Sequence, residues 1–404
     1  MSNSQLSTFN SHLIPPGYKQ TEVGVIPEDW KVTQIGELKP FVTSGSRGWA
    51  SYYSDRGSLF VRITNLSRDT IYLDLKDSKF VNLPPEANEG TRTQLQEHDV
   101  LISITADIGI VGYIDSRVSM PAYINQHIAL VRFDPTKTSG KFVSYFLASG
   151  KPQKLFRAST DVGAKAGMSL LTVQKLQLAL PPHFEQEAIA EALSDADALI
   201  ESQEQLLVKK RHLKQGAMQE LLTGKKRLPG FSGEWEVKRL GDVCHMKSGQ
   251  GITNADIDEF SEFPCYGGNG LRGFSKQYTH DGSYALIGRQ GALCGNVLSV
   301  DGRFFASEHA IVVTPQKETD IHWLSRILAR MNLNQYSESS AQPGLSVSKL
   351  LALECIVPRL PEQAAIAAIL SDMDAEIAAL EAKLAKARQL KQGMMQELLT
   401  GRVR

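Results

Sequence analysis

A stretch of forty residues occurs twice in this chain, and this repeat constrains the fold more than any other feature. Residues 185–224 return as residues 362–401 after a shift of 177 positions, with 26 of 40 residues identical and no gap. Repeats with periods of about 20 to 50 residues indicate solenoids or propellers, and this period is far longer. We therefore predict two copies of a whole module, each ending in the same long helix.

The repeated stretch has the heptad pattern of a helix that packs against another helix. Gln203 stands at a heptad position of the first copy and, with Lys210 and Lys214, predicts a looser pairing of that copy. Forty helical residues measure roughly 60 Å. We expect the two helices to pair, the alternative being two unrelated helices that each dock on their own domain. The predicted helix-pair residues are Ile189, Leu193, Ile200 and Leu207 in the first copy and Ile366, Leu370, Met373, Ile377, Leu380 and Leu384 in the second.

The segments that precede the two helices share their ends and differ in their middles. Trp30–Leu38 aligns with Trp235–Val243, and the shift of 177 already holds at Gly167 and Gly344. The Gly follows the Trp by 137 positions in the first segment and by 109 in the second. A duplicated frame keeps the parts that set geometry, so the differing middles predict two different recognition surfaces.

These observations predict a mixed α/β chain of the α+β class. Two globular recognition domains would be separated by two long antiparallel helices that form a coiled-coil-like pair, in a pseudo-twofold internal repeat. The expected segments are a flexible leader at 1–16, a first recognition domain at 17–182, a spacer helix at 183–224, a linker at 225–233, a second recognition domain at 234–358 and a second spacer helix at 359–404.

Short apolar runs bounded by Gly, Asp and Asn predict the strands of both domains. In the first domain we expect strands at Ser58–Ile63, Thr70–Leu75, Val100–Ile104, Val111–Ile114 and Ile128–Phe133, with helices at Phe142–Leu147 and Pro152–Arg157. In the second we expect strands at Tyr284–Gly288, Gly295–Val300 and Ala310–Thr314, followed by a helix from Ile321 to about Met331.

Composition narrows the classes of function. Lys plus Arg equals Asp plus Glu at 44 each, so a nucleic-acid role must rest on local patches or on the charge of a partner. The four cysteines have no metal-ligand spacing and are expected to be free thiols. With no signal peptide and no apolar segment of about 18 residues, we expect a cytoplasmic protein without a membrane span.

The enzyme motifs that we sought do not fit. Gly268–Gly273 has the spacing GxGxxG but is followed by residues typical of a strand, which favours a glycine-rich loop at a recognition surface or a plain turn over a dinucleotide site. Asp69, Asp74 and Lys76 form only a loose acidic cluster. His127 and His309 occupy equivalent strand positions, and we expect packed or hydrogen-bonded roles for both. We expect no catalytic residue and no metal site.

Three features of the sequence together carry a resemblance to a known family. They are the start Pro27-Glu-Asp-Trp30, the exits Leu180–Gln186 and Val357–Gln363, and the doubled ending LKQGxMQELLTG. In these the chain resembles the DNA-specificity subunit of Type I restriction–modification enzymes. The resemblance implies two target-recognition domains that bind the two halves of a split double-stranded DNA site, with an unrecognised spacer between them.

The same resemblance implies that the chain itself has no catalytic residues and no cofactor. Methylation from S-adenosylmethionine would belong to two modification subunits, and ATP- and Mg-dependent cleavage to restriction (translocase) subunits. We therefore predict a non-catalytic specificity subunit that directs adenine methylation and restriction. The rival hypotheses are a self-sufficient methyltransferase or nuclease and a coiled-coil adaptor that binds proteins only.

Candidate DNA contacts are residues that can bind base edges, phosphates or base faces. Trp49 has the alternative of a core residue under a surface loop. Residues 17–180 carry 19 basic and 16 acidic side chains (net +3), and residues 228–358 carry 11 and 14 (net −3), so we expect partners to supply phosphate contacts. The candidates are Ser46, Arg47, Gly48, Trp49, Tyr52, Tyr53, Arg62, Asn65, Arg68, Arg92 and Gln94 in the first domain, and Lys247, Gln250, Asn254, Asn269, Arg272, Lys276, Arg289 and Gln290 in the second.

Overall fold

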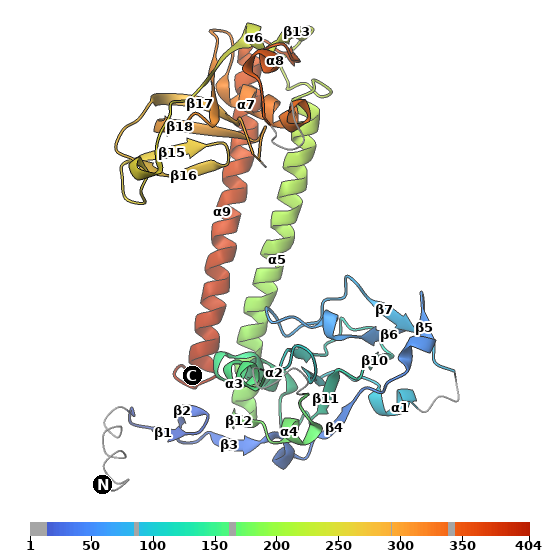
Figure 1. Ribbon diagram of the computed structural model, residues 1–404. Coiled ribbons are helices and arrows are strands. Elements are labelled where there is room, and N and C mark those ends of the chain that lie inside the picture. The colour runs from blue at the N-terminus through green and yellow to red at the C-terminus, as the bar shows by residue number, and fades with distance from the viewer. Residues whose placement is uncertain (1–13, 85–88, 161–166, 292, 338–343) are drawn as a thin grey trace. The chain divides into compact units, whose positions relative to one another are not determined.

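The computed structural model describes residues 14–84, 89–160, 167–291, 293–337 and 344–404, and it divides the chain into two compact units (Figure 1). Unit 1 joins the chain up to Glu204 to residues 383–404, and unit 2 comprises residues 205–382. Each unit therefore combines one globular part with one portion of each long helix. Residues 1–13 of the expected leader lie outside the described residues.

The globular part of unit 1 contains two four-stranded sheets. One has the order β4-β11-β8-β9 and is antiparallel, and the other has the order β10-β6-β7-β5 with β10 and β6 parallel. The hairpin β1–β2 and the antiparallel pair β3–β12 complete the unit. The strands are β1 (Tyr18–Thr21), β2 (Gly24–Pro27), β3 (Lys31–Gln34), β4 (Phe41–Ser44), β5 (Tyr53–Ser54), β6 (Ser58–Val61), β7 (Lys79–Val81), β8 (Val100–Ser103), β9 (Val111–Tyr113), β10 (Ala122–Ile124), β11 (Ile128–Arg132) and β12 (Gln177–Leu180).

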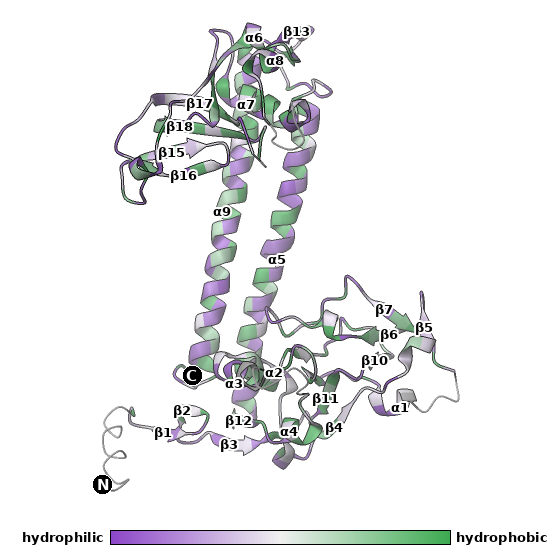
Figure 2. Ribbon diagram, in the orientation of Figure 1, coloured by the Kyte–Doolittle hydropathy of each residue, from purple (hydrophilic) through white to green (hydrophobic). Residues whose placement is uncertain are grey.

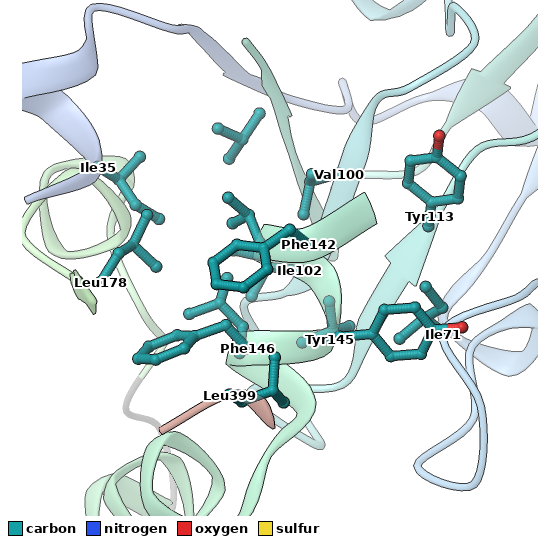
Figure 3. Close-up of a cluster of buried hydrophobic side chains, with 14 of the residues drawn as sticks. Ile35, Ile71, Val100, Ile102, Tyr113, Phe142, Tyr145, Phe146, Leu178 and Leu399 are labelled. Atoms are coloured by element: carbon teal, nitrogen blue, oxygen red, sulfur yellow. The ribbon is translucent and has the colours of Figure 1, made fainter. Parts of the chain in front are cut away.

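The main core of unit 1 lies between β8 and the helix α2 (Figure 3). The Ser139 hydroxyl begins α2 by accepting a hydrogen bond from the Phe142 amide, and Phe142, Tyr145 and Phe146 of the helix are buried with Val100 and Ile102 of β8. The helices of this unit are η1 (Ile35–Leu38), η2 (Trp49–Tyr52), η3 (Ile63–Asn65), α1 (Glu89–Thr93), α2 (Gly140–Ala148), α3 (Gly150–Thr160) and α4 (Leu170–Gln174).

The globular part of unit 2 contains one six-stranded sheet with the order β14-β19-β17-β18-β15-β16, in which only β15 and β18 are parallel among the described pairs. Its strands are β13 (Glu236–Arg239), β14 (Cys244–Ser248), β15 (Phe263–Gly267), β16 (Gly270–Ser275), β17 (His280–Gly288), β18 (Val297–Ala306), β19 (Ala310–Pro315) and β20 (Glu354–Val357). Its helices are α6 (Leu240–Val243), η4 (Asn254–Asp256), α7 (Ile321–Arg330), η5 (Leu333–Tyr336) and α8 (Val347–Leu351).

Apart from β5, which has no counterpart in the six-stranded sheet of unit 2, the main sheets of the two units have the same strand order, but one continuous strand of unit 2 is divided in unit 1. β18 pairs with β17 along most of its length and runs parallel to β15 at Phe305 and Ala306. In unit 1, β9 pairs with β8, and the separate strand β10 runs parallel to β6. Because β9 and β10 are separate strands, unit 1 has two sheets where unit 2 has one.

The repeated stretches form the helices α5 (His183–Leu221) and α9 (Leu360–Leu398), on which apolar and polar residues alternate (Figure 2). Both helices contribute to both units. In unit 1, Lys391 pairs with Asp197 at 2.5 Å and Arg388 with Glu204 at 2.6 Å. In unit 2, Arg211 pairs with Glu381 at 2.6 Å, and Lys214 pairs with Asp374. Since the numbers on α9 fall as those on α5 rise, the helix segments of each unit are antiparallel.

At the N-terminal end of each long helix, the predicted heptad residues pack into a core that contains residues of the globular part as well as of the other helix. Ile189 and Leu193 are buried in the core of unit 1, and Ile366 and Leu370 are buried in the core of unit 2. Farther along, Leu207 and Leu384 are buried, whereas Ile200, Met373, Ile377 and Leu380 are half-buried.

The polar heptad residues differ in the contacts that their side chains make. Lys210 and Lys214, expected to loosen the pairing of the first helix, form ion pairs with Glu376 and Asp374. The carbonyl oxygen of the Gln203 side chain is buried and has no hydrogen-bond partner among the described residues. Only this glutamine therefore carries the expected cost of a polar group at a heptad position.

An equivalent ion pair holds the first turn of each long helix. Glu185 of α5 is 8% exposed and accepts hydrogen bonds from Arg404 at 2.9 and 2.7 Å. Glu362 of α9 is 2% exposed and accepts from Arg227 at 2.6 and 2.7 Å. A carboxylate near a helix N-terminus also interacts favourably with the helix dipole. The shared helix start predicted from sequence thus has a structural role in both units.

Two local predictions need correction. Thr70–Leu75 is not a strand: it forms only an isolated bridge between Tyr72 and Tyr113, and the Asn65 side chain and backbone hold it as a loop through Asp74. Its apolar residues point to separate clusters, which is why the pattern resembled a strand. Gly268–Gly273 forms the turn and second strand of the β15–β16 hairpin, so the strand β16 stands where a dinucleotide site needs a helix.

Candidate functional site

In unit 1, three neighbouring strands begin or end at one edge of a sheet and bring polar loop residues together. β4 and β8 end there, and β11 begins there, because β11 pairs antiparallel with both. The residues around a hollow of ≈ 410 Å³ at this edge are Ser44, Gly45, Arg47, Thr105, Gln126 and His127. We call this set the strand-end site of unit 1.

The loop after β4 can approach the turn before β11 because it contains Gly45. A Cβ atom at Gly45 would lie 2.2 Å from the carbonyl carbon and oxygen of Asn125. In unit 2, a Cβ atom at Gly249 would lie 2.2 Å from the Ala306 carbonyl oxygen. Close approach of two backbone segments requires glycine at both positions.

Unit 2 has an equivalent strand-end site, which we define as Ser248, Gly249, Gln250, Arg289, Gln290, Glu308 and His309. The Ile104 amide donates to the His127 carbonyl at 2.9 Å in unit 1, and the Arg289 amide donates to the His309 carbonyl at 2.9 Å in unit 2. The carbonyl of Ile104 in turn accepts from Met168, and that of Arg289 accepts from Leu345. One backbone framework therefore presents different side chains in the two units.

The two histidines differ in the hydrogen bonds of their rings. The Gln126 amide nitrogen donates to Nε2 of His127 at 3.0 Å, which leaves Nδ1 to donate to the Thr105 hydroxyl. Nε2 of His309 lies 3.3 Å from Oε1 of Glu308, which can only accept. Two hydrogen bonds therefore fix the ring of His127, whereas the ring of His309 lies within ion-pair distance of Glu308. The expectation of a packed or hydrogen-bonded role is confirmed for the half-buried His127, whereas His309 is exposed, and both residues lie at a sheet edge.

Several predicted contacts of unit 1 lie on the surface at or near its strand-end site. Arg47 and Gly48 are exposed, and Ser46 is half-buried. Arg92 donates to the Ser46 hydroxyl at 3.0 Å and to the Thr43 hydroxyl, so it joins the same loop. The further surface candidates are Tyr53, which is 51% exposed, the half-buried Tyr52 and the exposed Gln94.

Four predicted contacts of unit 1 instead have structural positions. Trp49 is 3% exposed and stacks on Phe60 at a centroid distance of 4.9 Å, and Asn65 is 2% exposed, so neither offers a surface for a base. Arg62 donates to the backbone and carboxylate of Asp77 at 2.8 and 3.0 Å. Arg68 is held by Gln153, Asp107 and the Ile108 carbonyl. Single-residue chemistry suggested DNA contacts, whereas these tertiary partners occupy the side chains.

Some of the predicted contacts of unit 2 lie at its strand-end site. Arg289 donates to the Ser248 hydroxyl at 3.0 Å, and Gln250 forms an isolated bridge with Ser307. The hairpin turn at Gly268 touches the same place, since a Cβ atom there would lie 3.0 Å from the Gln290 carbonyl and 3.2 Å from that of His309. The remaining candidates are exposed residues of β14, the loop that follows it and the β15–β16 hairpin, namely Lys247, Asn254, Asn269, Arg272 and Lys276, with Arg272 donating to Asn254 at 2.9 Å.

Sequence reasoning missed Thr105, Gln126 and Glu308. Because His127 and His309 were matched as equivalent strand positions, the residue that precedes each of them could have been matched in the same way. These preceding residues, Gln126 and Glu308, were overlooked because neither belongs to a known motif. Among the described residues, no group of three or more His, Cys, Asp or Glu could hold a metal ion, and no helix is long and apolar enough to cross a membrane.

The family model for the Type I restriction modification DNA specificity domain matches residues 27–209 and 232–389. The chain belongs to this family. The two matched ranges contain both strand-end sites and most of α5 and α9. Each globular part is therefore one copy of the specificity domain.

Relatives and solved structures agree with this assignment. The chain is 49% identical over 145 residues to the Type I restriction enzyme EcoprrI specificity subunit of Escherichia coli, and 25% identical over 244 residues to the putative type I restriction enzyme MjaX specificity subunit of Methanocaldococcus jannaschii. These matches span 35% and 57% of this chain, and 36% and 56% of the relatives' lengths.

Solved structures share the fold at low sequence identity. The S subunit of a Type-I restriction-modification system from M. genitalium is 17% identical with a TM-score of 0.65, and the match covers 91% of this chain and 96% of that one. A chain from a type I R-M system studied for complex assembly and conformational transition has a TM-score of 0.53 at 16% identity, covering 94% and 99%. At such identities the likeness shows the fold alone.

Proposed function

We propose that this chain is the specificity subunit of a Type I restriction–modification complex and binds a bipartite, asymmetric DNA sequence. The observation that carries the proposal is the pair of strand-end sites. They share a backbone framework, as described above, but Thr105 and Gln126 in unit 1 stand where unit 2 has Gln290 and Glu308. Different polar side chains on equivalent frameworks suit two different half-sites, because base edges are distinguished by their donors and acceptors.

Arg47 and Arg289 supply the strongest base-contact chemistry of the two sites. A guanidinium can donate two parallel hydrogen bonds to O6 and N7 of guanine. Arg47 is exposed, and Arg289 is half-buried and oriented by the Ser248 hydroxyl. Residues around these arginines have amide side chains, which can form hydrogen bonds with adenine. Together the arginine and the amides would let each unit contact a few base pairs. The net charge of −3 over residues 228–358 fits a complex in which partners neutralise most phosphates.

In this proposal the chain is non-catalytic and carries no cofactor of its own. Two modification subunits would supply S-adenosylmethionine and methylate adenines, and restriction (translocase) subunits would supply ATP- and Mg-dependent cleavage. Exposed apolar residues on α5 of unit 2 support a protein partner there, since Leu206 is 40% and Leu213 is 50% exposed at heptad spacing.

Methylome sequencing tests the proposal. The chain is co-expressed with its modification subunit in a host free of adenine methylation, and methylated adenines are mapped across the genome. We expect a motif of two different halves separated by unspecified bases. A single continuous motif, or methylation without sequence preference, would contradict the proposal.

The long helices should set the number of unspecified bases. Inserting four residues after Ser202 and four after Ala379 adds roughly 6 Å to each helix. The expected methylome has a longer spacer and unchanged halves. An unchanged spacer in complexes that still methylate DNA would reject this role of the helices.

A further inference from the structure

The turn before β11 in unit 1 and the turn before β19 in unit 2 are equivalent at the level of single hydrogen bonds. The Asn125 amide donates to the Val61 carbonyl at 3.1 Å, and the Ser307 amide donates to the Tyr266 carbonyl at 2.8 Å. The same turn then closes when Ile128 donates to Asn125 at 3.2 Å and Ala310 donates to Ser307 at 3.0 Å. Gln126 and Glu308 therefore occupy the same backbone position in the two units.

Both side chains stand at the surface of their strand-end sites. Gln126 borders the hollow of unit 1 with Arg47 and Thr105. The Glu308 side chain is 41% exposed and lies next to the His309 ring. The backbone around each residue is held by the strand bonds described above, which gives the two side chains a rigid base from which to contact a ligand.

Glu308 has a hydrogen-bonding capacity that the described part of unit 2 leaves unused. Its Oε1 lies 3.3 Å from the His309 ring, whereas its Oε2 is covered and accepts no hydrogen bond from any described residue. The neighbouring Ser307 hydroxyl is also buried and likewise has no described partner. Covering a carboxylate oxygen without a donor is costly, so a ligand that donates a hydrogen bond to Glu308 would relieve this cost.

We propose that Gln126 and Glu308 are equivalent base-recognising residues, and that Glu308 accepts a hydrogen bond from the exocyclic amino group of cytosine. This inference rests on the proposed function. Carboxylates in the major groove accept from cytosine N4, whereas an amide forms two hydrogen bonds with adenine N6 and N7. The difference between Glu308 and Gln126 therefore contributes to the asymmetry of the target, with cytosine in the half bound by unit 2 and adenine in the half bound by unit 1.

The substitution Glu308→Gln tests the proposal in the complex with the modification subunit, using methylome sequencing and selection of bound duplexes from a DNA library. We expect one position of the half-site of unit 2 to change from cytosine to adenine, or to lose its preference, with discrimination altered roughly 5- to 150-fold. The half-site of unit 1 should not change. The reciprocal Gln126→Glu should alter only the half-site of unit 1.

Glu259→Gln is the matched control, because it removes one carboxylate from an exposed position in the loop after β14. It should leave the motif unchanged. Equal weakening of every sequence by Glu308→Gln would overturn the proposal, and so would a change at a guanine position, which would make Glu308 a positioning residue for Arg289. If Glu308→Gln fails to fold, an unchanged motif with Gln126→Glu overturns it.

Different results would reject the proposed function and the base-recognising roles of Gln126 and Glu308. A wild-type complex without a two-part motif would reject the proposed function itself. A two-part motif that neither reciprocal variant alters would leave that function in place and reject the base-recognising roles of Gln126 and Glu308.

Discussion

The globular parts of the two units are anchored to the long helices through equivalent aspartates with different partners. In unit 1, Asp197 accepts from the Tyr145 hydroxyl at 2.7 Å and pairs with Lys391, and the Asp197 and Lys391 side chains are 9% and 10% exposed. In unit 2, Asp374 pairs with Lys214 and with Arg326 at 2.8 Å, and its side chain is 42% exposed. The repeat retained the aspartate and the lysine, while the globular parts contribute a neutral residue or a cation.

The difference shows how one anchor tolerates two surroundings. A buried carboxylate needs a paired charge and hydrogen bonds, and Tyr145 supplies the second without adding charge. Burial raises the pKa of the Tyr145 hydroxyl, as does the neighbouring Asp197, so the tyrosine stays a neutral donor. Desolvation alone would raise the pKa of Asp374, but its hydrogen bonds and ion pairs with Lys214 and Arg326 outweigh it and lower that pKa. A more exposed carboxylate can therefore accept two cations.

The largest expected effect on stability comes from replacing the lysines of the two anchors. Lys391→Met leaves Asp197 buried without its counter-charge and should destabilise unit 1 by about 3–5 kcal/mol. Lys214→Met leaves Asp374 partly exposed and still paired with Arg326, so the cost should be about 1 kcal/mol or less. Calorimetry on the full chain measures both. Equal losses would mean that burial does not distinguish the two anchors.

The next largest effect on stability is expected at Gly45 and Gly249, the equivalent glycines of the two units. Gly45→Ala and Gly249→Ala each place a methyl group against backbone atoms 2.2 Å away, and each should cost about 1–3 kcal/mol through displacement of the loop. Gly216→Ala in α5 is the control, since its added Cβ meets no atom within 4 Å and a helical alanine is favoured over glycine by about 1 kcal/mol. Denaturant unfolding compares the three variants. A stable Gly45→Ala protein would show that the loop after β4 need not touch the turn at Asn125.

The smallest effect is the pH dependence of the unit 2 anchor. Because the folded pKa of Asp374 is lowered, its stabilisation is present above the unfolded value near 3.9 and is lost as pH falls through the folded pKa. Asp374→Asn should therefore lower the midpoint of thermal unfolding at pH 6, and its difference from the wild type should shrink as the pH falls below about 4. A difference that stays constant as the protein is acidified would contradict this assignment.

Local patterns predicted the elements whose burial is uniform. β8, β11 and β19 are continuous apolar runs, and α7 carries an apolar face with Asp320 as its N-cap, so each lies close to its predicted bounds. Thr70–Leu75 failed because its apolar residues serve two separate clusters, which a pattern cannot distinguish from one face of a strand. The prediction of DNA contacts at Trp49 and Asn65 failed because residue chemistry alone does not reveal burial.

The amino-acid sequence by itself determined the duplication, the two long helices and the family, because helical periodicity and a repeat without gaps can be seen in the order of the residues alone. Only the tertiary structure decided which residues form each strand-end site. Gly45, Thr105 and Gln126 come from three loops far apart in the chain, and antiparallel pairing of β4, β8 and β11 brings these loops to one edge. That pairing depends on long-range hydrogen bonds and core packing, which leave no local periodic signal in the sequence.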